Sequence, residues 1–267
     1  MSATPAPSAA RTRRKTQIAA ANPPIAALPL DPARIAFTGS AQLDEPAPAT
    51  VYVQVLCWPI MATAWGSLTQ TWRTTRVERG DRKPPTAAAA SVTSWIRACA
   101  PQLGAPFRDS TAEDSSIAAL LTRTPIEIAV VIQDSRKRRD PAGTREHPQL
   151  EALSGCLSHY SDAARARRRN PCAMLLSRAR GPAIDRQCLK ELEHAKSMNS
   201  ETGSLAQMQL HFWDQPKEPL PLELANVIAA AVLKHLLDRD GFNPVFEAVL
   251  GKLVHPAFPY AMRAKKR

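Results

Sequence analysis

The chain has 267 residues, a formal net charge of +11 and a hydrophobic content of 44%, so it is long enough to bury a sizeable core. No segment approaches the ~20 consecutive apolar residues of a membrane-spanning helix, and five cysteines at irregular spacing are a poor disulfide framework. We therefore expect no membrane partner and a reducing, cytoplasmic location.

The N-terminal segment has the composition of a flexible tail. Residues 1–46 are rich in Pro, Ala and Ser and carry basic residues such as Arg11, Arg13 and Arg14. Such a composition buries too little apolar surface to offset the entropy of ordering. We predict a disordered basic arm over 1–46 and one folded α+β domain over 47–267.

The folded part opens with a strand and then a predicted helix. Val51, Val53 and Val55 alternate with other side chains, which is typical of a strand. A stripe of apolar side chains at spacings of 3 and 4 predicts that a helix follows, with Pro59 in its first turn; the stripe is Trp58, Met61, Trp65, Leu68 and Trp72. Further helices are expected from Thr86 and from near Ser110, the latter burying Ile117, Leu120 and Leu121.

The middle of the chain is helical and basic in this interpretation. The β-branched run 126–132 predicts a buried strand, and a polar loop follows from Arg136. Helices are expected from Pro148, over 165–169, and over 185–196. Asn170 and Pro171 predict a short helix that ends at Gly181.

The C-terminal part adds the clearest patterns. Residues 206–212 alternate between apolar and polar and predict a half-buried strand. Residues 222–237 predict an apolar core helix, while 242–254 fit either a helix or a strand. This order favours a helix-rich fold with a small, ferredoxin-like sheet, in which the arginine-rich helices of 134–197 are an insertion.

Basic residues concentrate in that predicted insertion. From Asp134 to Lys190 there are 13 Lys and Arg against 6 Asp and Glu, and Arg165, Arg168 and Arg169 share one helical face. Arginine matches phosphate geometry, so we expect nucleic acid as the partner, with RNA slightly preferred because ferredoxin-like sheets are common RNA platforms. The expected contacts are Arg136, Arg138, Arg139, Arg165, Arg167, Arg168, Arg169, Arg178 and Arg180.

Catalytic motifs are absent from the sequence: it has no phosphate-binding loop, no zinc-protease motif and no nucleophile elbow. We expect no cofactor and no metal, although Cys156 and His159 have a C-x-x-H spacing. A metal-independent ribonuclease needs only a general base and nearby cations. The candidates for that role are His159, Tyr160 and His211.

A ferredoxin-like core with basic helices is similar in outline to the endonucleases that process CRISPR repeat RNA. The resemblance covers 50–254 only as an order of elements, and the glycine-rich C-terminal loop of those enzymes is missing, because Gly251 stands alone. The resemblance implies an endoribonuclease as the first alternative function. The second is a non-enzymatic component of a larger complex, which docks through the tryptophan stripe or the helix 225–237.

Overall fold

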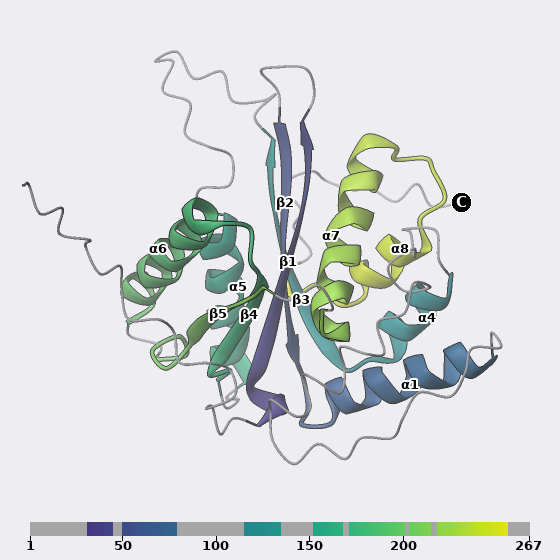
Figure 1. The fold of residues 1–267 in the computed structure, drawn as a ribbon, viewed down its shortest axis with the longest axis horizontal. Coiled ribbons are helices and arrows are strands. Elements are labelled where there is room, and N and C mark those ends of the chain that lie inside the picture. The colour runs from purple at the N-terminus through teal and green to yellow at the C-terminus, as the bar shows by residue number, and fades with distance from the viewer. Residues whose placement is uncertain are drawn as a thin grey trace, which may run out of the picture.

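The computed structural model describes residues 31–44, 50–78, 115–134, 152–167, 171–200, 203–214 and 218–255. These residues form a five-stranded mixed sheet with helices on both faces (Figure 1). The strands are β1 (Ile35–Asp44), β2 (Thr50–Pro59), β3 (Ile126–Asp134), β4 (Met174–Arg178) and β5 (Gln209–Trp213). The helices are the 3-10 turn η2 (Pro32–Arg34) and α1 (Ala64–Glu78), α4 (Ser115–Arg123), α5 (Ala152–Arg167), α6 (Pro182–Met198), α7 (Leu220–Leu237) and α8 (Pro244–Leu250).

The strand order is β3-β2-β1-β4-β5, with β1 at the centre. The pairs β1–β2 and β2–β3 are antiparallel, whereas β1–β4 and β4–β5 are parallel. Only β2 therefore runs against the other strands. Parallel neighbours require a crossover connection, and α5 and α6 provide it before and after β4.

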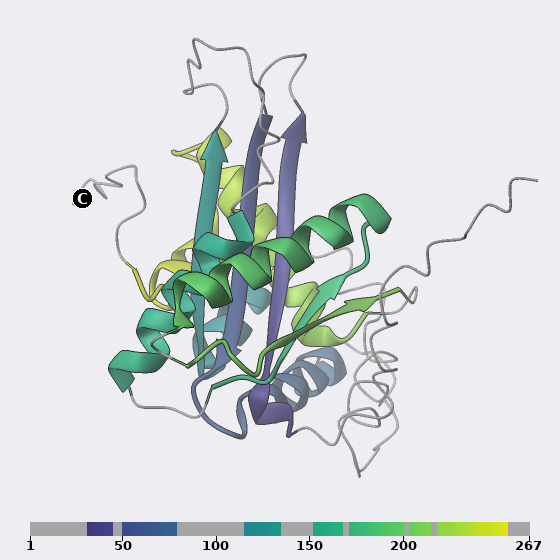
Figure 2. The same cartoon turned by 90° about the vertical axis from the view of Figure 1, so that its left-hand side faces the viewer.

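Alternation along the strands divides the apolar side chains between two cores. On β2, Val53, Val55 and Cys57 belong to the core beneath α7, while Leu56 and Trp58 belong to the core beneath α5 and α6. Figure 2 shows α5 and α6 lying across one face of the sheet, and α1, α4, α7 and α8 lie on the other face (Figure 1). Each face of the sheet is thus buried, as expected of a parallel α/β core.

The central strand is the main correction to the predicted arm. Residues 1–30 lie outside the described residues, but Ile35–Asp44 is a strand whose Ile35, Ala36 and Phe37 are fully buried. The prediction of a tail up to residue 46 is wrong here because small residues give β1 a weak strand pattern. Close packing against α7 requires a glycine at position 39 of this strand, since an added Cβ would lie 2.3 Å from the Ala225 carbonyl carbon.

The tryptophan stripe is not one face of a helix. Trp58 and Pro59 belong to β2, and the helix begins only at Ala64. Trp58 and Trp65 are both buried, but they lie in different cores on opposite faces of the sheet. The helical spacing arose because a strand is followed by a helix. Since both side chains are buried on opposite faces of the sheet, they provide no docking patch. The side chain of Trp72 and the helix predicted from Thr86 lie outside the described residues.

The segment 171–181 contains the strand β4 and not the predicted short helix. Met174, Leu175 and Leu176 are fully buried, and β4 pairs with β1 and β5 on its two sides. A continuous apolar run is typical of a strand buried on both faces, and Met and Leu conceal it because they are good helix formers. The strand β4 is part of the sheet, and α5 and α6 cover a face of it, so the predicted arginine-rich insertion is not confirmed. The β-α-β-β-α-β order of a ferredoxin-like core is not confirmed.

Several predicted elements are confirmed. The predicted strand 126–132 is β3, and the predicted helices 185–196 and 222–237 are α6 and α7. Ile117, Leu120 and Leu121 are buried on α4 as expected. The helix α7 is apolar and long enough to pass a composition test for a membrane span, but it packs on β1 and β2 as a core helix.

Candidate functional site

The strand β4 ends at Arg178 beside the middle of β1, and a crevice lies at this carboxyl end of β4. The chain leaves β1 toward β2 on one side and leaves β4 through α6 toward β5 on the other side. Such a switch point leaves an open crevice, where ligands of open α/β sheets usually bind. A cavity of about 170 Å³ lies at this position. Its lining residues are Thr38, Gly39, Ser40, Gln54, Ser177, Arg178, Arg180 and Asn226.

Polar side chains replace apolar ones where the sheet approaches this cavity. On the α5 side of β1 and β2, Leu56 gives way to Gln54 and Tyr52, and Ala36 gives way to Thr38. These residues form a buried chain of hydrogen bonds: the Tyr52 hydroxyl donates to Gln54 (2.5 Å), the Gln54 amide donates to Thr38, and Thr38 donates to the Val55 carbonyl (2.7 Å). A network that is satisfied in this way rigidifies the wall of the cavity.

Arg180 connects the chain of hydrogen bonds to the cavity. Its Nη1 donates to the Ser40 hydroxyl (2.8 Å) and the Tyr52 hydroxyl (2.9 Å), and its Nη2 donates to the Cys188 sulfur (3.4 Å). A guanidinium has five N–H donors, so two of them have no acceptor among the described residues. None of these three partners is a carboxylate, and no ion pair neutralises this guanidinium within the described part of the chain.

Arg178 has a different electrostatic setting. Its side chain is 60% exposed and forms an ion pair with Glu218, whose side chain is 2% exposed. The Asn226 amide donates to the same carboxylate (3.4 Å), and the Asn226 oxygen accepts from the Ser40 backbone N–H (3.2 Å). Glu218 and Asn226 therefore fix the α7 side of the crevice and offset the charge of Arg178, while the charge of Arg180 is left to attract an anion.

The titratable groups beside Arg180 stay protonated. Burial raises the pKa of the Tyr52 phenol, and the nearby Arg180 guanidinium only partly offsets this effect. Burial likewise raises the pKa of the Cys188 thiol against the influence of Arg180. Neither group is activated as a nucleophile, and the crevice is chemically suited to binding an anion by hydrogen bonds.

The predicted arginines do not converge on one surface. Arg178 and Arg180 line the crevice at the carboxyl end of β4. Arg165 and Arg167 lie at the end of α5, where Arg165 pairs with Asp162 (2.7 Å) and Arg167 pairs with the buried Glu127. Because Glu127 is the second residue of β3, which runs parallel to β1, that pair lies at the opposite end of the sheet. The remaining predicted contacts lie outside the described residues: Arg136, Arg138, Arg139, Arg168 and Arg169.

The three candidate catalytic residues lie apart from the crevice. The ring of His159 packs against His255, with ring centres 4.4 Å apart. The Tyr160 hydroxyl is buried and accepts a hydrogen bond from the Cys172 backbone N–H (2.6 Å). His211 is 2% exposed, and its Nε2 has no hydrogen-bond partner among the described residues. None of these residues lines the Arg180 cavity.

The C-x-x-H pair does not form a ligand cluster. Cys156 is fully buried and its thiol points to the backbone carbonyl of Gln54 (3.5 Å), while the neighbouring His159 faces His255. Burial strongly raises the pKa of the Cys156 thiol. In the described ranges, no group of three or more His, Cys, Asp or Glu side chains has an arrangement suited to a metal ion.

Sequence reasoning found the two arginines of the crevice but missed its polar wall. Thr38 falls in the segment interpreted as a tail, and Gln54 was assigned to a strand but not to a site. One signal was available: polar Gln54 and apolar Leu56 occupy the same face of β2, which marks a change from core to site. Asn226 could not be identified as a site residue from the sequence, because only the packing of α7 against β1 brings it to the crevice.

Comparison of the chain with protein-family models, with curated proteins and with solved structures found no match.

Proposed function

We propose that the protein binds nucleic acid and that a backbone phosphate enters the crevice at the carboxyl end of β4, beside β1. The observation that carries the proposal is Arg180, whose guanidinium is partly buried and lines a cavity. It has no carboxylate partner among the described residues, and two of its donors are free. Burying a charge without a counterion is costly, so an incoming phosphate offsets an existing cost. Arginine binds phosphate with a planar fork of donors.

The size of the cavity favours one group of a polymer over a whole small molecule. Sites for small ligands usually occupy about 300–1,000 Å³, whereas this cavity has about 170 Å³. A phosphate with its hydration fits this space, and the rest of the ligand would lie outside. The net charge of +11 adds long-range attraction for a polyanion.

RNA is the preferred form in this proposal, for a reason different from the predicted sheet type. The crevice is lined by hydroxyl and amide side chains, among them Ser40, Ser177 and Asn226. Such groups suit a ribose 2′-hydroxyl, which donates and accepts hydrogen bonds and distinguishes RNA from DNA.

The experiment compares two arginine variants of equal charge in oligonucleotide binding. Fluorescence anisotropy with a mixed-sequence single-stranded 20-mer, as RNA and as DNA, is measured at several salt concentrations for the Arg180→Gln and Arg165→Gln variants. Arg165 is exposed and already pairs with Asp162, so it is the matched control. We expect Arg180→Gln to weaken binding at least tenfold, and to reduce the log–log salt slope by roughly 0.7 to 0.9, the value of one phosphate contact.

A third variant separates charge from geometry. Arg180→Lys keeps the charge but loses the fork, so its affinity should fall between those of the wild type and Arg180→Gln. Urea unfolding of each variant establishes that the protein is folded. The proposal fails if a folded Arg180→Gln protein loses no more affinity than Arg165→Gln.

A further inference from the structure

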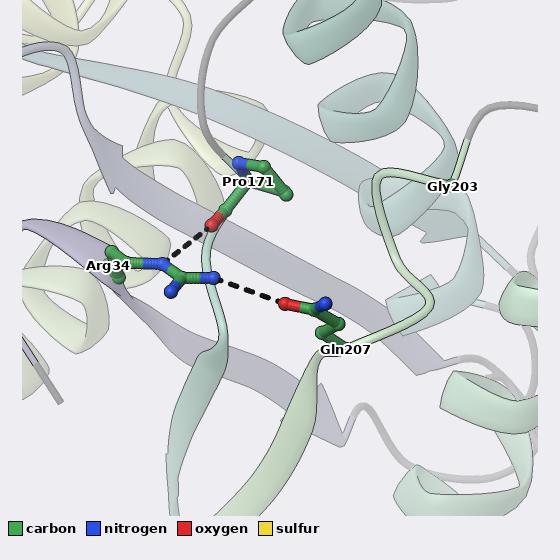
Figure 3. A pocket seen from close by; sticks show the side chains of 4 residues that line it. All are labelled: Arg34, Pro171, Gly203 and Gln207. Atoms are coloured by element: carbon green, nitrogen blue, oxygen red, sulfur yellow. Dashed lines mark hydrogen bonds between the residues drawn. The ribbon is translucent and has the colours of Figure 1, made fainter. Parts of the chain in front are cut away.

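A second cavity lies at the opposite end of the sheet, at the amino ends of β4 and β5. It has a volume of about 340 Å³ and is lined by Arg34, Pro171, Gly203 and Gln207. Figure 3 shows the Arg34 guanidinium reaching between the Pro171 carbonyl and the Gln207 side chain. Its Nε donates to the carbonyl (3.2 Å), and its Nη2 donates to the Gln207 Oε1 (3.4 Å).

Backbone hydrogen bonds hold the walls of this cavity in place. The Ala173 N–H donates to the Arg34 carbonyl (2.9 Å), and the Gln209 N–H donates to the Ala173 carbonyl (3.0 Å), so the beginnings of β1, β4 and β5 are tied together. Gly203 has a φ of 63°, a left-handed conformation that glycine adopts without strain. The Ala206 N–H closes the turn on the Gly203 carbonyl (3.2 Å). The cavity is therefore formed before any ligand arrives.

Arg34 carries a charge that its neighbours do not neutralise. The two hydrogen bonds use two of the five guanidinium N–H donors and both acceptors are neutral. No carboxylate pairs with Arg34 in the part of the chain that the structure describes. The guanidinium accordingly offers three donors and a positive charge to an anion in the cavity.

We propose that this cavity is a second anion site, which binds the phosphate group of a ligand of mononucleotide size. The volume of about 340 Å³ falls in the range of small-ligand sites, in contrast to the crevice of Arg180. The guanidinium binds the phosphate, the Gln207 amide lies within reach of a neighbouring polar group, and the ring of Pro171 forms an apolar wall. The source of the phosphate is either a free nucleotide or the phosphorylated end of a strand.

The experiment is a calorimetric titration of the full chain with uridine monophosphate, with uridine as the ligand that lacks the phosphate. We expect uridine monophosphate to bind and uridine to bind at least tenfold more weakly. Arg34→Gln should weaken the binding of the monophosphate at least tenfold. Gln207→Glu, at an exposed position, places a carboxylate against the guanidinium and should have the same effect without removing a buried group.

Two further variants separate this site from the proposed function. Arg180→Gln and Arg165→Gln should leave the affinity for uridine monophosphate unchanged, even if the oligonucleotide experiment fails. A competition experiment in the Arg180→Gln protein then distinguishes the two sources of the phosphate. If a 5′-phosphorylated tetranucleotide displaces uridine monophosphate, the natural ligand is the end of a strand. If it does not displace uridine monophosphate, the natural ligand is a free nucleotide. The proposal is overturned if uridine monophosphate does not bind, if uridine binds equally well, or if the two variants of the cavity bind it like the wild type.

Discussion

Replacing Gly39 by alanine should test the packing that forms both the core and the crevice. Gly39 lies on β1 directly beneath α7, and its backbone lines the Arg180 cavity. An added Cβ would lie 2.3 Å from the Ala225 carbonyl carbon and 2.5 Å from the Asn226 backbone nitrogen. Ordinary carbon contacts are about 3.5–4.0 Å, so α7 would have to move by roughly 1 Å or more.

The expected cost follows from what must move. The added Cβ would meet the backbone of α7 and not the end of a flexible side chain. A shift of α7 would also disturb the core on this face of the sheet, to which α7 contributes Ile228, Ala229 and Val232. Overpacking a core usually costs about 1–3 kcal/mol and occasionally more. We expect Gly39→Ala to lie at the upper end of that range, at about 3 kcal/mol.

Urea unfolding of Gly39→Ala and of a matched control, Gly66→Ala, checks this value. Gly66 lies within α1, and an added Cβ there would meet nothing within 4 Å, so the control should gain up to about 1 kcal/mol from helix propensity. The two identical substitutions should therefore change stability in opposite directions. A Gly39→Ala protein within about 0.5 kcal/mol of the wild type would refute the packing of α7 on β1.

The remaining predictions concern the α5 terminus, a tryptophan and a buried histidine. The Glu191 carboxylate accepts from the Leu153 and Ser154 backbone N–H groups (2.8 and 3.1 Å), so Glu191→Ala should cost about 1–3 kcal/mol in urea unfolding, whereas the exposed Glu193→Ala should cost less than about 0.5 kcal/mol. The Trp65 indole donates to the buried Ile35 carbonyl (2.9 Å), so Trp65→Phe should cost at least about 1 kcal/mol in the same assay. Burial lowers the pKa of His211 below its ordinary 6.5, so the unfolded chain binds more protons below pH 6.5, and stability should fall with acidification there by at most about 1.4 kcal/mol per pH unit. His211→Leu should flatten that decline, and an unaltered pH profile would contradict the assignment.

The sequence predicted the elements whose pattern comes from their own residues. The apolar run of α7 and the β-branched run of β3 are recognisable from their own residues, because α7 is buried over much of its length and β3 over its first half. Such patterns need no knowledge of the neighbours.

The failures share a physical cause, which is that tertiary contacts decided the structure. The small residues of β1 are strand residues because α7 lies against Gly39, and β4 is a strand because two neighbours pair with it. The spacing of Trp58 and Trp65 spans the end of a strand and the start of a helix. Their common helical period was accidental.

The candidate site was only half accessible to sequence reasoning. Charge density pointed equally to Arg165, Arg167, Arg178 and Arg180, but the structure pairs all of them except Arg180 with acidic side chains. The difference between these arginines depends on which residues surround them in space. The crevice is formed by strands that are distant in sequence, so its polar wall became visible only with the order of the strands.

Hydrogen exchange of the full chain, with and without a single-stranded RNA 20-mer, tests the central claim most directly. The segment 177–182 joins β4 to α6 and carries both arginines of the crevice. If a phosphate enters the crevice, the RNA should slow amide exchange in 177–182 and in the facing residues 38–40 of β1, and Arg180→Gln should abolish that protection. Protection confined to the end of α5, around Arg165 and Arg167, with none in 177–182, would contradict the account.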